Sequence, residues 1–215
     1  MNWLQGGPFL ELSFIIMEPI QIGEVISKLQ NIRFKIEVHN PPEYLHQYYE
    51  GYPYDEDDPH SERIHQITLN LTVHTTRKRR ALLFVEKISS ALVAFSICFY
   101  GDADDAPEWN QPGIRNDELD EFICLLNSIH SELEFNVGCL ALEEDIKGLF
   151  DVNEVWPNEK YQLSNLNFKD NLNKFQAVLI SQSLQDKLPD APYTRVNHSG
   201  LLYKSALRRL LRDEL

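Results

Sequence analysis

The chain has 215 residues, of which 43% are hydrophobic and 11% aromatic, so it is long enough to bury the core of one domain. Its formal net charge is -13, with 33 Asp and Glu residues against 20 Lys and Arg residues. Such a charge repels phosphate backbones, which argues against nucleic acid as a partner and favours a basic protein.

Alternating hydrophobic and polar residues mark three strands in the first part of the chain, because every second side chain of a strand faces the same side. The three segments are 9–16, 32–39 and 63–75. Between the first two, hydrophobic residues recur every three or four positions and predict an amphipathic helix over 19–30. The polar faces of the second and third strands are too hydrophilic to be covered by a helix, so we expect them to line a solvated sheet face.

The middle of the chain repeats this strand-helix-strand order. A short strand is expected over 82–86, after a basic turn at 77–80, and a more hydrophobic one over 91–100. Hydrophobic residues at helical spacing predict a helix over 117–132, with Asn116 as its N-cap. Another strand is expected over 134–142.

The last third gives a weaker pattern. Residues 143–150 suggest a short helix, and 168–179 suggest another, although Val178, Leu179 and Ile180 also suit a strand. We expect one α+β domain over 1–190, interrupted by a long insertion over 40–62 that is rich in Tyr and acidic residues. A basic helical tail over 191–215 is expected to pack on that domain.

The order of these elements predicts an α+β fold with a mixed or antiparallel sheet and helices packed on one face. Two strand-helix-strand units favour a ferredoxin-like arrangement of βαβ units, followed by a C-terminal extension.

The cysteines indicate a reducing compartment. Cys98, Cys124 and Cys139 are odd in number, widely spaced and set among hydrophobic residues, which is typical of buried, unreactive thiols. The first residues carry no basic stretch of a signal peptide, and no apolar stretch is long enough to span a bilayer. We therefore expect a cytoplasmic protein with no membrane contact.

Sequence motifs of catalysis are missing. There is no nucleophile elbow, no zinc-binding histidine pair and no glycine-rich phosphate loop, so we expect no catalytic residues, no metal and no cofactor. The acidic residues after the strand 91–100 do not have calcium-loop spacing. An alternative stays open, in which this cluster converges with a second one to form the metal site of a hydrolase. That second cluster is Glu143, Glu144 and Asp145.

Two segments combine features that suit protein binding. Aromatic side chains offer large contact areas, and neighbouring carboxylates complement Lys and Arg. The candidate residues in the insertion are Tyr48, Tyr49, Tyr52, Tyr54, Asp55, Glu56, Asp57 and Asp58. Those in the acidic loop over 101–115 are Asp102, Asp104 and Asp105.

These features predict a non-enzymatic, acidic protein-binding module whose partner is another, basic protein. Its most specific form is an immunity-type or antitoxin-type inhibitor of a basic toxin protein, since acidic inhibitors of basic enzymes gain association rate from charge complementarity. Two alternatives are kept: the metal-dependent hydrolase, and a structural protein that forms homo-oligomers.

Overall fold

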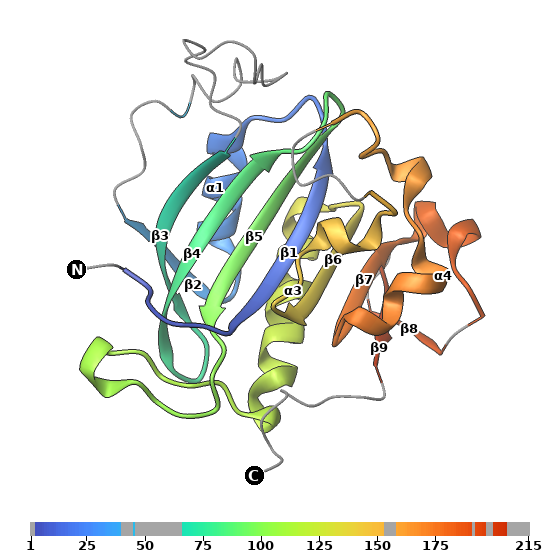
Figure 1. Ribbon diagram of the computed structural model, residues 1–215. Coiled ribbons are helices and arrows are strands. Elements are labelled where there is room, and N and C mark those ends of the chain that lie inside the picture. Colours follow the sequence, from blue (N-terminus) through green and yellow to red (C-terminus); the bar gives the residue numbers. More distant parts are fainter. Residues whose placement is uncertain are drawn as a thin grey trace.

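The computed structural model describes residues 3–39, 45, 66–152, 158–190, 192–196 and 200–205. The strands are β1 Phe9–Met17, β2 Lys35–His39, β3 Gln66–His74, β4 Lys78–Lys87, β5 Leu92–Tyr100, β6 Val137–Leu142, β7 Ala177–Ser181, β8 Tyr193–Arg195 and β9 Gly200–Lys204. They form one nine-stranded sheet in the order β2-β3-β4-β5-β1-β6-β7-β9-β8 (Figure 1). Every pair of neighbouring strands is antiparallel.

The helices include two long ones and several short ones. The α-helices whose bounds lie within the described residues are α1 Ile22–Asn31, α3 Leu119–Leu133 and α4 Phe168–Asn171. The 3-10 helices are η2 Pro107–Trp109, η3 Asn116–Glu118, η4 Ile146–Leu149, η5 Leu163–Asn165, η6 Leu172–Lys174 and η7 Gln182–Lys187. Among the described residues, no helix combines the length and hydrophobicity needed to cross a membrane.

The main core lies between the sheet and the two long helices, behind the sheet in Figure 1. Alternate residues of the central strand β1 point into it, and Phe14 is fully buried there. Its ring centroid lies 5.1 Å from that of Phe95 on β5 and 5.2 Å from that of Phe135. On α3, a hydrophobic stripe that includes Phe122 completes this side of the core.

A second core covers the opposite face, but only over part of the sheet. There Ile15, Cys139 and Val178 are buried under α4 and the neighbouring 3-10 helices. The outer face of β2 and β3 has no such layer among the described elements, and Gln66 and Thr68 are exposed on it. Thr72, which the sequence also placed on this face, is only 3% exposed, so the expected solvated face is present over part of these strands.

The α+β class and the antiparallel sheet predicted from the sequence are confirmed. The two long helices share one face, as expected, whereas α4 lies on the other. The ferredoxin-like arrangement is not confirmed, because three strands separate β1 from β2. The connection from β5 through α3 to β6 does form a split unit: these two strands are parallel and flank β1.

Two sequence-based boundaries need correction. The basic turn was expected to cover 77–80, and this is wrong for 78–80. There β4 has already begun at Lys78 and pairs with β3. The helix expected from Gly200 is wrong over 200–204, which is strand β9, while 206–215 lies outside the described residues. Tyr193–Arg195 also forms a strand, so both segments extend the sheet instead of packing on it as a helix.

Candidate protein-binding surface

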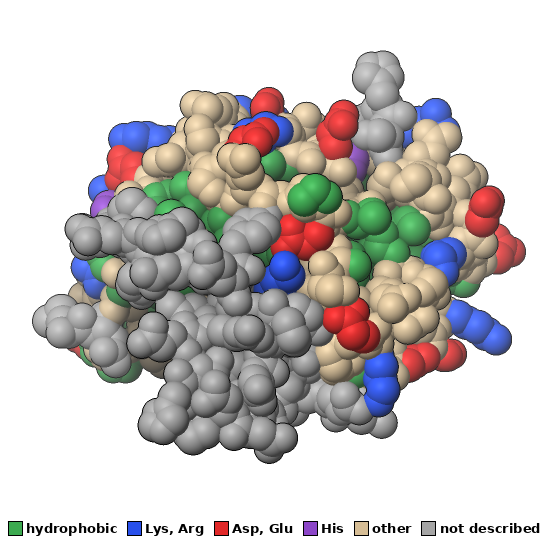
Figure 2. Space-filling view, turned by 90° about the horizontal axis from the view of Figure 1, so that it is seen from above, with side chains coloured by type: hydrophobic (Ala, Val, Ile, Leu, Met, Phe, Trp, Pro, Cys, Tyr) green, Lys and Arg blue, Asp and Glu red, His purple; other side chains and the backbone are tan. Residues whose placement is uncertain are grey.

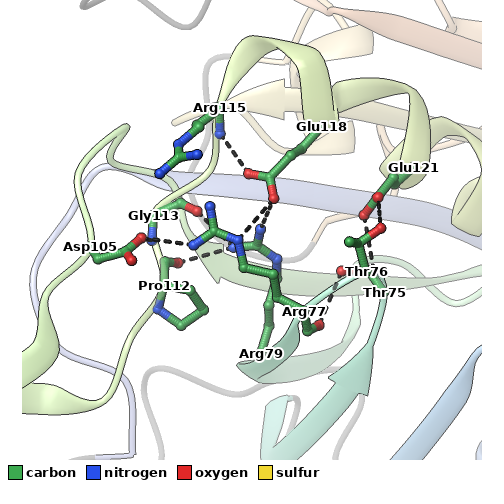
Figure 3. A network of polar contacts seen from close by, with 10 residues as sticks. All are labelled: Thr75, Thr76, Arg77, Arg79, Asp105, Pro112, Gly113, Arg115, Glu118 and Glu121. Atoms are coloured by element: carbon green, nitrogen blue, oxygen red, sulfur yellow. Dashed lines mark hydrogen bonds and ion pairs between the residues drawn. The ribbon is translucent and has the colours of Figure 1, made fainter.

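One buried guanidinium organises the end of the sheet where β4 begins (Figure 3). The side chain of Arg79 is only 2% exposed, and its ion pair with the Glu118 carboxylate measures 2.9 Å. It also donates to the carbonyl oxygens of Pro112 at 3.0 Å and Gly113 at 2.9 Å. The guanidinium carbon lies 5.5 Å from the ring centroid of Phe122. Because a buried cation is costly unless it is paired, this arrangement fixes the acidic loop against α3.

The second arginine of the segment ties down one of the predicted aspartates. Arg77 donates to Asp105 at 2.9 Å and pairs with Glu118 at 3.1 Å. Asp105 also accepts the backbone N–H of Gly113 at 2.9 Å. That N–H and the Arg77 guanidinium hold the pKa of the Asp105 carboxyl below its usual range. Asp105 therefore braces the loop, and its charge is already balanced within the chain.

The start of α3 is held in the same network. The backbone N–H of Arg115 donates to Glu118 at 2.9 Å. Both the backbone N–H and the hydroxyl of Thr76, in the turn before β4, donate to Glu121 (Figure 3). The acidic loop and the turn at 75–77 are thus joined to one helix end, which limits how the loop can move.

The tip of the loop presents an aromatic ring. Trp109 is one of two large hydrophobic residues that are exposed among the described residues, at 37%. Reciprocal backbone hydrogen bonds between Ala106 and Gln111, of 2.7 Å and 3.1 Å, close the loop beneath it. Arg80 donates to the Trp109 carbonyl oxygen at 3.2 Å. Trp109 is not among the residues that the sequence pattern predicts to bind a partner.

The predicted acidic residues of this loop have three different roles. Asp102 is half-buried and accepts the backbone N–H of Asp104 at 3.2 Å, which shapes the turn. Asp105 is the brace described above. Asp104 is exposed, as is Glu108 beside Trp109, and neither makes an ion pair within the part of the chain that the structure describes. These two carboxylates and the Trp109 ring form what we call the loop-tip surface.

The eight predicted residues of the insertion cannot be compared with the structure. Tyr48, Tyr49, Tyr52, Tyr54, Asp55, Glu56, Asp57 and Asp58 lie outside the described residues. Their role in binding stays a prediction.

The two acidic clusters leave the sheet at the same end, because β5 and β6 are parallel. They do not form a metal centre: no group of three or more His, Cys, Asp or Glu side chains within the described ranges is arranged to hold a metal ion. The second cluster makes internal bonds instead. Glu143 accepts the backbone N–H of Phe9, and Asp145 caps η4 by accepting from the Lys147 N–H at 2.7 Å.

A half-buried carboxylate lies beside this second cluster. Glu11 is in the middle of β1, where it faces Cys98 on one neighbouring strand and Ala141 on the other. Burial, together with the charges of Asp145 and Glu143, raises the pKa of Glu11 to about 7, although Lys147 opposes the shift. The sequence pattern indicated only a polar position there. The sequence does not show that this strand is central in the sheet, where a carboxylate has little access to water.

Two hollows flank the start of β4. A separate hollow of about 410 Å³ lies elsewhere, between α1 and Leu133 at the end of α3. The two at β4 have volumes of about 290 Å³ and about 400 Å³, and both are lined by Lys78 and Asn110. The first opens on the outer face of β2 to β4, and the second lies against the acidic loop.

Acidic side chains do not gather in one patch on the face that Figure 2 shows. Figure 2 views the molecule from above, and the described acidic and basic side chains are interspersed there with hydrophobic ones. Charge alone therefore does not locate a binding surface on this face, and local geometry has to be considered.

No known family model and no curated protein matches this sequence. Among solved structures, the Pseudomonas aeruginosa T6SS protein PA0821 is similar, with a TM-score of 0.38 and 11% sequence identity. The match covers 91% of this chain and 64% of that protein, so the chain spans less than two thirds of its length. At this TM-score the similarity indicates neither a shared fold nor a shared function.

Proposed function

We propose that this chain is a non-enzymatic protein-binding module, and specifically an immunity-type or antitoxin-type inhibitor of a basic toxin protein in the cytoplasm. The observation that carries the proposal is the loop-tip surface, where the exposed Trp109 ring lies on the same short loop as Asp104 and Glu108. Trp is the residue type most enriched among the residues that dominate binding energy, and carboxylates around it select a basic partner.

The rigid support of this surface favours binding. The loop is closed by the hydrogen bonds between Ala106 and Gln111 and is held at its base by Arg77 and Arg79. A segment that is already ordered loses less conformational entropy when it binds. The overall charge of -13 adds a long-range attraction for a basic protein, which accelerates encounter.

Affinity capture from the native host tests the proposal. The wild-type chain is expected to retain a basic protein. A variant with Trp109→Ala, Asp104→Asn and Glu108→Gln is expected to lose it. The charge-matched control is Glu132→Gln with Glu134→Gln, two exposed residues at the opposite end of α3.

Binding kinetics with the captured protein give the decisive measurement. The loop-tip variant is expected to associate more slowly and with a weaker salt dependence, whereas the control should keep most of the wild-type rate. Equal rates for all three proteins would remove the loop-tip surface from the interface. A captured partner that is acidic would contradict the basic-toxin form of the proposal.

A further inference from the structure

The hollow on the outer sheet face has a basic and aromatic lining. It encloses about 290 Å³, and no acidic side chain of the described residues lines it. Its lining residues include Trp3, His39, Thr72, Lys78, Arg80 and Asn110. A basic hollow on a chain of net charge -13 is unexpected, because nothing in the overall charge requires it.

The walls of this hollow are fixed. The indole N–H of Trp3 donates to the carbonyl oxygens of Leu71 at 3.1 Å and Ala81 at 2.9 Å, so the ring is anchored across β3 and β4. The Arg80 guanidinium lies 5.0 Å from the Trp3 ring centroid. The His39 ring centroid lies 5.0 Å from that of Trp3. A ligand would therefore meet a preformed surface.

Two of the four basic residues at 77–80 are not paired with a carboxylate among the described residues. Arg77 and Arg79 both pair with Glu118. Lys78 and Arg80 make no ion pair within the described part of the chain. The Glu37 carboxylate accepts a hydrogen bond from Lys35, and Lys78 only adds to the lowering of its pKa through its charge. Two like charges on one strand repel each other, so an anionic ligand would relieve that repulsion.

We infer that this hollow binds an extended acidic peptide segment of another protein, with carboxylates at alternate positions. Lys78 and Arg80 are two residues apart on β4 and share its outer face. Alternate residues of any extended chain are about 6.6 Å apart, so a segment that runs along β4 can place one carboxylate at each cation. Charge-assisted hydrogen bonds to Lys and Arg are among the stronger polar contacts.

Nucleic acid fits this hollow less well than an acidic peptide. The Trp3 ring already has the Arg80 guanidinium and the His39 ring as neighbours. It is therefore poorly placed to stack a base. A polyanion would also meet the long-range repulsion of a chain with net charge -13, which a short peptide with two carboxylates largely escapes. This site goes beyond the proposed function, because it takes charge of the opposite sign from that recognised by the loop tip.

The test is a titration of the whole, isotopically labelled chain with the capped peptide Thr-Glu-Thr-Glu-Thr. The capped peptide Thr-Gln-Thr-Gln-Thr serves as the neutral control. Saturable shifts of the Trp3 indole N–H signal are expected with the first peptide and not with the second. Lys78→Gln should weaken binding at least about tenfold, the effect of losing about 1.4 kcal/mol. Because Lys78 is exposed, its replacement leaves the fold intact.

Lys28→Gln, which removes an exposed lysine from α1, is the charge-matched control and should bind like the wild type. Three results would overturn the inference: no shift with either peptide, equal shifts with both, or equal weakening by Lys28→Gln and Lys78→Gln. Tighter binding of a single-stranded oligonucleotide than of the acidic peptide would overturn it as well.

Discussion

Arg79 and Glu118 form a nearly buried ion pair of 2.9 Å that joins the beginning of strand β4 to the beginning of α3. The same guanidinium donates to two carbonyl oxygens of the acidic loop. One side chain thus connects the sheet, the helix and the loop that carries the proposed binding surface.

Replacement of Arg79 is expected to be costly. Arg79→Met leaves Glu118, which is 12% exposed, without its buried partner, and should lower the free energy of unfolding by about 3 kcal/mol. Arg77→Met removes a pair with the same carboxylate, but the Arg77 side chain is 26% exposed, so its loss should cost about 1 kcal/mol or less. Urea unfolding of both variants measures the difference. Equal losses would show that burial does not set the strength of these pairs.

Stability should depend on the ionisation of Glu11. The pKa of Glu11 in the folded chain is about 7, above the ordinary value of 4.5. Between pH 4.5 and pH 7, Glu11 therefore stays protonated in the folded chain but is ionised in the unfolded chain. Stability from this group therefore falls as the pH rises from 4.5 to 7. Glu11→Gln removes the effect and should stabilise the chain by about 1–2 kcal/mol at pH 8, after allowance for solvent screening.

At pH 4.5 the same variant should be as stable as the wild type, because Glu11 is protonated there. Unfolding curves across this pH range measure the trend, with the exposed Glu132→Gln as the control. A stability difference that stays constant between pH 4.5 and 8 would contradict the assigned shift.

Two glycines should respond in opposite directions to replacement by alanine. A Cβ at Gly113 would lie 2.5 Å from the Asp104 carbonyl oxygen, so the acidic loop would have to shift. We expect Gly113→Ala to cost about 2 kcal/mol. At Gly23, on α1, such a Cβ would have no atom of the described residues within 4 Å apart from its chain neighbours and the helix's own backbone, so Gly23→Ala should stabilise the chain by about 0.5–1 kcal/mol. Thermal unfolding of both variants checks the signs.

One thiol should react in the folded chain. Cys124 is exposed, which corrects the expectation that all three cysteines are buried. Cys98 is 4% exposed and Cys139 is fully buried, and burial raises the pKa of both thiols. A colorimetric thiol reagent should therefore modify one cysteine quickly and the others only after unfolding. Cys124→Ser should abolish the fast phase, and a fast phase that persists would contradict this assignment.

Divalent cations should not stabilise the chain, in contrast to the hydrolase alternative. Asp105 is occupied by Arg77 and the Gly113 N–H, and Asp145 by the Lys147 N–H. We expect 1 mM Mg²⁺ or Mn²⁺ to change the melting temperature by less than about 1 °C, since only ligands that bind the folded state shift it. A clear, saturable rise of the melting temperature would support the metal site of the hydrolase alternative.

The hydrophobic pattern predicted most of the described sheet. The strands β1, β2, β3, β5 and β6 and the helices α1 and α3 are all close to their expected positions. Local pattern is sufficient there because each element has one face that must be buried. The pattern failed at the start of β4, where Arg79 occupies a buried position. No periodicity identifies a buried charge, since its partner Glu118 is far away in the sequence.

The C-terminal strands failed for a related reason. Gly200–Lys204 was predicted to be helical because Leu202, Ala206 and Leu210 are four residues apart. In the structure this segment pairs with β7 on one side and β8 on the other. Such a short segment is specified by its neighbours in the sheet and not by its own periodicity.

The sequence by itself determined the α+β class, the order of most elements and the acidic charge, because these follow from residue types and from their spacing along the chain. Only the tertiary structure decided which carboxylates are available. It pairs Asp105 with Arg77, leaves Asp104 and Glu108 exposed beside Trp109, and places Glu11 in a central strand. The physical reason is that exposure, ion pairing and pKa depend on neighbours in space, which for these residues come from distant parts of the chain.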